Sequence, residues 1–229
     1  MSKVDVILTS FNRPRMVTQA VESVLQQSYK NFLLWAMDDN SIPEVQEILQ
    51  VFAKKDKRII LKISDVKQED RKKTCRYAVL INQALKLGSS PYISYITDDT
   101  EYLPDRLQKM VEFMDKNPAA SVCYGNQKML NLINNTVSYR SYNKVITRAF
   151  NVLDHNSILH RRSILLKTGY WSESAAHWPC SDAIFWDQIM NAGFLFYPVN
   201  AITEIYKVHS KSIISCWGSK SEFIDGIRE

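Results

Sequence analysis

The sequence predicts an α/β fold in which helices flank a mostly parallel sheet. Short apolar runs rich in β-branched and aromatic residues alternate with longer segments whose apolar residues recur at helical spacing. Strands and helices that alternate in this way form βαβ units, and such units build parallel sheets. A chain of 229 residues can bury a sizeable core, and we expect one domain over residues 1–229.

Four strands and three helices are predicted in the first hundred residues. The strands are compact apolar runs at residues 4–10, 32–37, 58–63 and 92–97. Helical spacing marks residues 16–27, a segment from Pro43 to Phe52, and a segment from Tyr77 to a stop at Gly88. A polar, charged loop at residues 64–73 precedes the third helix.

The remainder of the chain is less regular. Helices are expected at residues 103–117, 163–169 and 182–191, and strands at residues 119–124 and 158–160. Residues 127–150 are rich in Asn, Tyr and Ser and form either a hairpin or a mobile cover. Beyond residue 199 no pattern stands out, and we expect the last twenty residues to be poorly ordered.

Composition argues against several classes of protein. No apolar run approaches the ~18–20 residues of a membrane-spanning helix, and Asp5, Arg13 and Arg15 interrupt the region where a signal peptide has its apolar core. We therefore expect a cytoplasmic protein. The four cysteines form no C-x-x-C pair, which indicates reduced thiols. The net charge of +5 is mild and no nucleic-acid-binding motif occurs, so nucleic acid is not an expected partner.

Two adjacent carboxylates, Asp98 and Asp99, directly follow the fourth predicted strand. Open α/β sheets bind their ligands at the carboxyl ends of the strands. Adjacent acids at such an edge repel each other unless a cation lies beside them, and Mg²⁺ or Mn²⁺ with a bound diphosphate meets this need. The alternative is that the pair caps the following helix, because Asp is a favoured N-cap residue.

The glycines argue against two common classes of nucleotide-binding protein. Six glycines are present, and they form neither G-x-G-x-x-G nor a Walker P-loop, which disfavours a dinucleotide dehydrogenase and a P-loop NTPase. A bound phosphate would then be neutralised by a metal that carboxylates hold. Asp39, which follows the second predicted strand, joins Asp98 and Asp99 as a candidate residue in this site. The basic cluster of Arg71, Lys72 and Lys73, with Arg76 close behind, also suits a phosphate-bearing substrate.

Four ordered blocks carry a resemblance to a known family. The blocks cover residues 6–13, 37–41, 74–84 and 95–99. They resemble family 2 glycosyltransferases of the GT-A fold, a Rossmann-like fold, and their spacing is closest to that of members from spore-coat polysaccharide biosynthesis. The resemblance covers roughly the first 130 residues well and the rest thinly. Four blocks in the same order are far more specific than any single motif.

The resemblance implies a pocket for the base of a UDP- or dTDP-sugar donor. Thr9 and Phe11 would line this pocket, with the Phe11 ring stacked on uracil or thymine. Asp39 would accept a hydrogen bond from the ring N–H of the base. Taken alone, Thr9 and Phe11 are better explained by ordinary packing at a strand end, and Asp39 by a turn.

The resemblance also implies a diphosphate site with a metal. Arg71 would approach the base or the phosphates, and Arg76 is its rival for this role. Asp98 would bind the ribose, or the metal through water. Asp99 would ligate Mn²⁺ or Mg²⁺ between the phosphates. His209 falls where some GT-A enzymes supply a further metal ligand, although a lone histidine is weak evidence of ligation.

A sugar transfer with inversion also needs a base on the acceptor side. Four acids are candidates: Asp154, Glu173, Asp182 and Asp187. Asp182 lies in a segment that resembles the family block with the catalytic aspartate, so it is our predicted base. The alternative is a helix N-cap or first-turn acid.

Three other residues have two interpretations each. Trp171 and Trp178 form either an acceptor platform or part of the core, since sugars lay apolar faces on aromatic rings. His160 resembles a family segment beside the donor site, and we expect it to make a structural hydrogen bond.

The sequence thus predicts a metal-dependent, inverting glycosyltransferase. It would move a sugar from a UDP- or dTDP-sugar to a hydroxyl acceptor in polysaccharide or glycoconjugate synthesis. Residues 1–100 would bind the nucleotide, and residues 101–229 the acceptor. Two alternatives remain: a non-catalytic sugar-nucleotide-binding protein and a nucleotidyltransferase. The second normally has a Gly-rich loop and a Lys after the first strand, and residues 9–12 contain neither.

Overall fold

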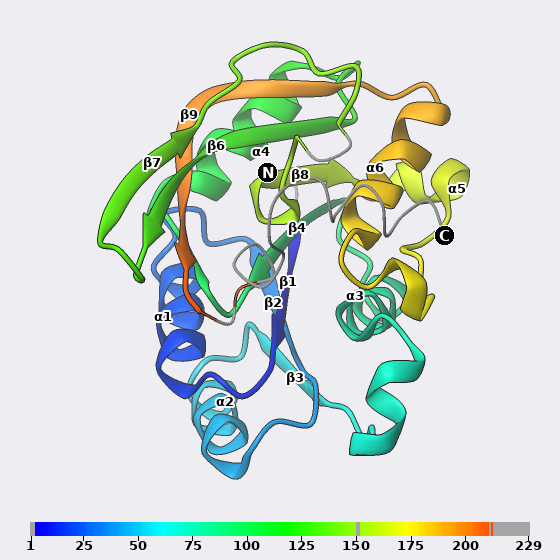
Figure 1. The fold of residues 1–229 in the computed structure, drawn as a ribbon. Coiled ribbons are helices and arrows are strands. Elements are labelled where there is room, and N and C mark those ends of the chain that lie inside the picture. Colours follow the sequence, from blue (N-terminus) through cyan, green and yellow to red (C-terminus); the bar gives the residue numbers. More distant parts are fainter. Residues whose placement is uncertain (1–2, 150–151, 211, 213–229) are drawn as a thin grey trace.

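The computed structural model describes residues 3–149, 152–210 and 212, which fold around a nine-stranded sheet (Figure 1). In the order of the chain, the strands are β1 (Val4–Ser10), β2 (Phe32–Asp38), β3 (Ile59–Ile63), β4 (Tyr92–Thr97), β5 (Thr100–Tyr102), β6 (Val122–Asn131), β7 (Thr136–Arg140), β8 (Ile158–Arg161) and β9 (Phe196–Val208). In the sheet their order is β3-β2-β1-β4-β8-β6-β9-β5, and β7 pairs with β6.

Half of the sheet is parallel and the other half is mixed. Strands β3, β2, β1 and β4 run parallel to one another, as the βαβ pattern predicts. Thr9 is the register partner of Met37 in β2 and of Thr97 in β4, so the three strands end at the same edge. Strand β8 is antiparallel to both β4 and β6, and β9 is parallel to β6.

The helices lie close to their predicted positions. They are α1 (Pro14–Leu25), α2 (Pro43–Lys55), α3 (Arg76–Leu87), α4 (Arg106–Lys116), α5 (Leu165–Thr168) and α6 (Ser181–Asn191). Short 3₁₀ turns cover Gln68–Lys73, His155–Ser157, Arg162–Ile164 and Ala175–His177. Helices α1 and α2 each have a proline in the first turn, where the missing N–H has no helical partner to lose.

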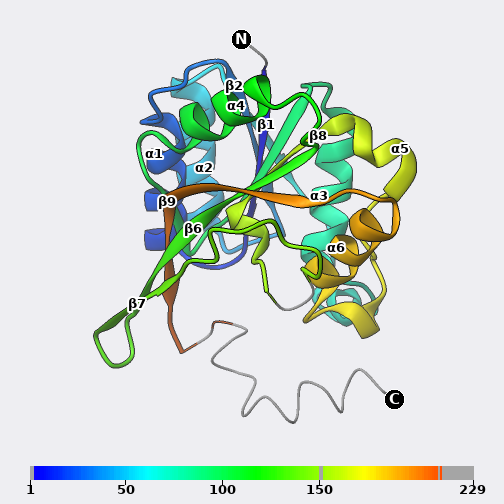
Figure 2. The ribbon, with the colours of Figure 1, turned by 90° about the horizontal axis from the view of Figure 1, so that it is seen from above.

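Helices cover both faces of the sheet (Figures 1 and 2). Helices α1, α2 and α4 lie on one face, and α3 and α6 lie on the other. All seven residues of β1 are buried, as expected for a strand covered on both faces. Val6 and Leu8 pack in the core beneath α1, whereas Ile7 packs in the core beneath α3. Because successive side chains of a strand point to opposite faces of the sheet, the apolar residues of β1 are divided between two cores.

The second half of the sheet departs from the sequence prediction in two ways. The predicted end of a strand before Gly125 is wrong, because β6 starts at Val122 and continues through Gly125 to Asn131. Strands β6 and β7 form a hairpin, which is one of the two predictions for residues 127–150. Gly125 is needed inside β6, since a Cβ there would overlap the Thr203 side chain of β9.

The sequence analysis did not predict β5 and β9. The pairing between β6 and β9 shifts register on both sides of Asn126, and Asn200 in β9 has a φ of 56°. Such irregularities disturb the period-two pattern by which a strand is recognised. Strand β5 has three residues, too few to show a pattern. The prediction for the last twenty residues falls almost entirely outside the described part of the chain.

Two findings bear on the composition. Cys75, Cys123 and Cys180 are free and buried, while Cys216 lies outside the described residues. Within residues 3–149, 152–210 and 212, no helix is both long and apolar enough to span a membrane.

Replacement of Gly125 by alanine tests the close contact between β6 and β9. We expect Gly125→Ala to lower the free energy of unfolding by roughly 1–3 kcal/mol, because the new methyl group is forced against buried Thr203. Urea denaturation measures this difference. In a double variant with Thr203→Ala, part of the loss should be recovered relative to the sum of the two single variants. A Gly125→Ala protein as stable as the wild type would contradict the packing described here.

Candidate active site

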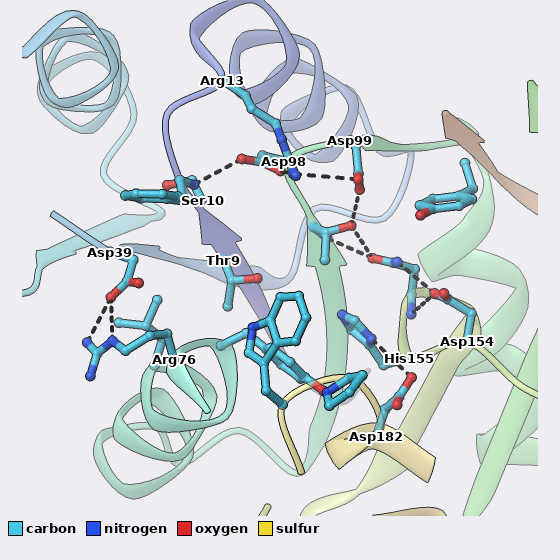
Figure 3. A pocket seen from close by; sticks show the side chains of 18 of the residues that line it. Thr9, Ser10, Arg13, Asp39, Arg76, Asp98, Asp99, Asp154, His155 and Asp182 are labelled. Carbon is cyan, nitrogen blue, oxygen red and sulfur yellow. Dashed lines mark hydrogen bonds and ion pairs between the residues drawn. The ribbon is translucent and has the colours of Figure 1, made fainter. Parts of the chain in front are cut away.

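A pocket of about 890 Å³ opens at the edge where β1, β2 and β4 end (Figure 3). Helix α6 and the segment around His155 complete its wall. All eight residues predicted from the sequence to form the site line this pocket: Thr9, Phe11, Asp39, Arg71, Arg76, Asp98, Asp99 and Asp182. The structure therefore brings together residues that are far apart in the chain.

Turns after β1 and β2 direct the polar residues to this edge. Asn12 and Asn40 both have a φ of 55°, a left-handed conformation that asparagine tolerates well. The side chain of Asn12 accepts a hydrogen bond from the backbone N–H of Ile42 at 2.8 Å, so the two turns support each other. Asp38 is turned inward, where it accepts hydrogen bonds from Ser41. Its neighbour Asp39 faces the pocket instead.

Asp39 lies between two arginines. Its Oδ2 accepts a hydrogen bond from Nη2 of Arg71 at 2.5 Å, and its Oδ1 accepts hydrogen bonds from Nε and Nη2 of Arg76 at 3.0 and 2.8 Å. The guanidinium of Arg71 also lies over the Phe11 ring, 3.6 Å from the ring centroid. Sequence reasoning left Arg71 and Arg76 as rivals, and both contact Asp39. A planar cation thus lies on one face of the Phe11 ring, which was predicted to stack on a base.

Asp98 and Asp99 share a third arginine, Arg13. Nη1 of Arg13 is 2.5 Å from Oδ1 of Asp98 and 3.5 Å from Oδ2 of Asp99. Asp98 also accepts a hydrogen bond from the backbone N–H of Phe11 at 3.0 Å. Oδ1 of Asp99 accepts a hydrogen bond from the hydroxyl of Thr97 at 2.5 Å. The carboxylate pair is therefore compensated by a guanidinium, as adjacent buried acids require.

The two carboxyl groups differ in acidity. Burial raises the pKa of Asp98 to about 6; Arg13 opposes this rise, and the charge of Asp99 adds to it. Burial also acts to raise the pKa of Asp99, but the hydrogen bond to His209 and the charge of Arg13 outweigh it. The pKa of Asp99 is therefore below its ordinary value.

The residues at this edge fit a divalent ion that arrives with a diphosphate. Asp98 and Asp99 offer carboxylate oxygens, and Nε2 of His209 lies 3.4 Å from Oδ2 of Asp99. Over the described residues, no group of three His, Cys, Asp or Glu side chains is arranged to hold a metal. The protein thus offers a partial set of ligands, and Mg²⁺-type sites commonly complete theirs with substrate phosphates and water.

Asp182 lies in the first turn of α6 and lines the pocket. Its Oδ1 accepts a hydrogen bond from the backbone N–H of Ala183 at 2.8 Å. Its Oδ2 is 3.6 Å from Nδ1 of His155, which also lines the pocket (Figure 3). Sequence reasoning missed His155. The polar run Asp154-His155-Asn156 before the predicted strand at residues 158–160 was the available signal.

The three other candidate bases are placed differently. Asp154 lines the pocket, but its side chain accepts hydrogen bonds from the N–H groups of Asn156 at 2.9 and 2.7 Å. Glu173 accepts a hydrogen bond from the side chain of Asn82 at 2.8 Å. Neither Glu173 nor Asp187 is among the residues that line the pocket.

Trp171 and Trp178 occupy different environments, and His160 makes the hydrogen bond that was expected of it. Trp171 is only 2% exposed and belongs to the core, whereas Trp178 is 42% exposed and lines the pocket. His160 is fully buried, and its Nε2 is 2.7 Å from the hydroxyl of Tyr95, so the expected structural hydrogen bond is present. Burial lowers the pKa of His160 to about 4.

A buried polar network behind the pocket supports Thr97 and Asp99. The side-chain oxygen of Asn156 accepts a hydrogen bond from the backbone N–H of Thr97 at 2.7 Å, and the Asn156 carbonyl accepts one from Arg106 at 2.5 Å. Arg106 is fully buried and forms an ion pair with Glu204 of β9. No local pattern predicts this network, since its members come from different elements.

Comparison with known proteins identifies the family. Residues 5–164 match the model of the family described as Glycosyl transferase family 2. Protein CgeD of Bacillus subtilis is 40% identical over 211 residues, which are 88% of this chain and 49% of CgeD. The UDP-Glc:alpha-D-GlcNAc-diphosphoundecaprenol beta-1,3-glucosyltransferase WfaP of Escherichia coli is 25% identical over an alignment that covers 100% of this chain and 84% of WfaP.

Solved structures agree on the fold. S. aureus TarS in complex with UDP-GlcNAc superposes with a TM-score of 0.76 at 16% sequence identity, over 99% of this chain and 64% of that chain. The chain spans about half the length of CgeD. It belongs to glycosyl transferase family 2, and its fold is the GT-A fold that the sequence resemblance predicted.

Proposed function

We propose that this chain catalyses metal-dependent transfer of a sugar, with inversion, from a UDP- or dTDP-sugar to a hydroxyl acceptor. The observation that carries the proposal is the arrangement of three acidic positions around one pocket: Asp39 on one side, Asp98 and Asp99 at the strand ends, and Asp182 across from Asp39 (Figure 3). Two similar proteins support a uridine nucleotide: WfaP is a glucosyltransferase that uses UDP-Glc, and TarS has been solved in complex with UDP-GlcNAc.

The nucleobase would bind between Phe11 and Asp39. Uracil and thymine carry the same ring N–H, which can donate a hydrogen bond to the Asp39 carboxylate. Cytosine has no proton at this position. The base would displace the Arg71 guanidinium from the Phe11 ring, because both are planar and compete for one face. Arg71 would then turn toward the phosphates, and Arg76 would keep Asp39 in place. Thr9, which also lines the pocket, would contact the base as well.

Asp99 and Asp98 would hold Mn²⁺ or Mg²⁺ together with the donor diphosphate, with His209 as a further candidate ligand. A bound divalent ion would stabilise the negative charge that develops on the leaving nucleoside diphosphate. Arg13 lies where a cation would lie between the carboxylates, so donor binding would release it toward the phosphates. Arg13 and the ion are therefore alternative counterions for one carboxylate pair.

Asp182 would act as the base. Its carboxylate would take the proton of the acceptor hydroxyl as the hydroxyl oxygen forms a bond to the anomeric carbon. The bond from that carbon to the diphosphate oxygen breaks on the opposite face, and its electron pair leaves with the nucleoside diphosphate. One displacement of this kind inverts the configuration of the anomeric carbon.

The acceptor would enter beside Tyr142 and Trp178, two partly exposed aromatic residues that line the pocket. Aromatic rings of this kind offer apolar faces to a saccharide. Tyr142 follows the β6–β7 hairpin, which agrees with the proposed division into a nucleotide-binding part at residues 1–100 and an acceptor-binding part at residues 101–229. A role in polysaccharide or glycoconjugate synthesis follows from such an acceptor. The cytoplasmic location stays a prediction.

Calorimetric titration of nucleoside diphosphates tests the donor site. With Mn²⁺ present, UDP and dTDP should bind, and GDP, CDP and ADP should bind at least about tenfold more weakly. EDTA should weaken UDP binding. Asp39→Asn should reduce UDP affinity by about tenfold, a difference of roughly 1.4 kcal/mol, because the uncharged amide oxygen accepts a weaker hydrogen bond than a carboxylate.

Asp56→Asn is the matched control, because Asp56 pairs with Arg58 at the end of α2 and does not line the pocket. Metal-independent binding without preference for a base would contradict donor use. It would favour the non-catalytic alternative.

Removal of Arg13 tests its role as an alternative counterion. Without metal, Arg13→Met should destabilise the protein by roughly 1–3 kcal/mol, since it leaves two buried carboxylates without their cation. Thermal unfolding with and without Mn²⁺ and UDP measures the effect. Added metal and nucleotide should raise the melting temperature more in this variant than in the wild type. Arg15→Met, at an exposed neighbouring arginine, should neither lower the stability nor enlarge the response to metal and nucleotide. Equal responses of both variants would refute the idea.

Conversion of the proposed base to its amide tests the chemical step. Asp182→Asn should lower kcat by about 10²- to 10⁴-fold, because the amide cannot take the acceptor proton. UDP affinity should stay unchanged, since Asp182 lies away from the donor contacts. Released nucleoside diphosphate reports turnover with each sugar nucleotide. Asp187→Asn on the same helix is the control and should retain activity. Normal turnover by Asp182→Asn would remove Asp182 as the base.

A further inference from the structure

His155 is held rigidly beside Asp182 by aromatic rings. Its ring lies parallel to that of Tyr77, with an interplanar angle of 7° and centroids 5.9 Å apart. Tyr95 and Trp171 meet it nearly edge-on, at centroid distances of 6.5 and 5.7 Å. Tyr77 belongs to α3, Tyr95 to β4, and Trp171 to the core below α6. Contacts on the face and on the edges leave the imidazole little freedom to turn away from Asp182.

The charges around His155 favour its protonated form. Burial lowers the pKa of His155, but the carboxylates of Asp182, Asp154 and Asp99 outweigh burial and raise it above the ordinary value. The two tyrosines that face it stay neutral, because burial raises the pKa of Tyr77 and of Tyr95. In the described part of the chain, the buried Nε2 of His155 has no hydrogen-bond partner. The contact with Asp182 is the largest of the interactions that raise the pKa of His155, so Asp182 is the main partner of the imidazolium.

Both oxygens of Asp182 are directed by groups of the protein. Oδ1 accepts from the N–H of Ala183 at the start of α6, and Oδ2 faces Nδ1 of His155 at 3.6 Å. This distance is slightly longer than a hydrogen bond, and such contacts often tighten when substrates bind. The side chains of His155 and Asp182 are 13% and 22% exposed, so two bound substrates would remove much of the remaining water. Loss of water makes an ionised carboxylate costly unless a cation accompanies it.

We propose that His155 is a positioning residue, whose imidazolium keeps the carboxylate of Asp182 ionised and directed toward the acceptor hydroxyl. The proposal rests on the role of Asp182 as the base. It concerns the chemical step and not donor binding, because Asp39, Asp98 and Asp99 make the predicted donor contacts elsewhere in the pocket (Figure 3). Loss of His155 should therefore lower kcat and leave the donor KM unchanged.

Two replacements of His155 separate positioning from packing. The amide nitrogen of asparagine can take the place of Nδ1, whereas leucine fills space without a donor. His155→Leu should lower kcat by on the order of 100-fold, the cost of a misplaced catalytic group, and His155→Asn should recover at least about tenfold of that loss. His177→Leu is the matched control, because His177 shares a hydrogen bond with the Ser172 side chain and does not line the pocket. Equal loss in His155→Asn and His155→Leu would overturn the proposal.

The pH dependence of kcat gives a second readout. His155 loses its charge as the pH rises through its raised pKa, so wild-type kcat should fall on the alkaline side of that value. His155→Asn has no group that titrates there and should lack this decline. Identical alkaline profiles in the two proteins would overturn the proposal. Thermal unfolding and UDP binding show whether each variant is folded.

NMR titration of isotope-labelled histidine tests the pair without turnover. In the wild type, His155 should titrate above its ordinary pKa of about 6.5, and Asp182→Asn should lower that value, because the largest interaction that raises it is lost. An unchanged value would refute the pairing itself. A lowered value in an Asp182→Asn protein that keeps full turnover would instead show that Asp182 is not the base, and the positioning role would fall with the proposed function.

Discussion

The structure depends on how its buried carboxylates are compensated at one edge of the sheet. Parallel pairing of β1 with β2 and β4 ends these strands together and places Asp39, Asp98 and Asp99 around one pocket. Buried acids are costly without partners. Three arginines meet this constraint: Arg71 and Arg76 at Asp39, and Arg13 at the pair. In the proposed donor complex the base would displace Arg71 and the metal would displace Arg13, while Arg76 would stay at Asp39. The contacts that stabilise the fold thus also prepare the proposed donor site.

The mixed half of the sheet supports this edge from behind. Fully buried Arg106 and Glu204 tie α4 to β9, and Arg106 also holds the carbonyl of Asn156. The side chain of Asn156 in turn fixes Thr97, which bonds Asp99. A buried ion pair contributes little stability against an apolar alternative, but loss of one partner is costly. We infer that the network serves to locate the end of β4, because its hydrogen bonds converge there.

The two sides of the pocket are built differently. The proposed donor side consists of strand ends and tight turns, in which each carboxylate has an arginine. The proposed acceptor side consists of a helix start, a 3₁₀ turn and partly exposed aromatic residues, in which the carboxylate of Asp182 faces an imidazole. A guanidinium stays charged at any ordinary pH, whereas an imidazolium does not. The proposed chemical step should therefore be sensitive to alkaline pH, where an imidazolium loses its charge, while Asp98, with a pKa of about 6, is the group on the donor side that titrates at acid pH.

The sequence by itself determined the βαβ order and the acids at the strand ends, because apolar period and turn chemistry are local properties. Asp39, Asp98 and Asp99 follow their strands directly, and four ordered blocks were enough to indicate the family. Tertiary structure alone decided the pairing of β6 with β9, where a bulge and Gly125 obscure the strand pattern. It also decided that His155 faces Asp182 and that Arg13 lies between Asp98 and Asp99. These pairs join different elements, and only the packing of those elements against one sheet brings their charges within reach.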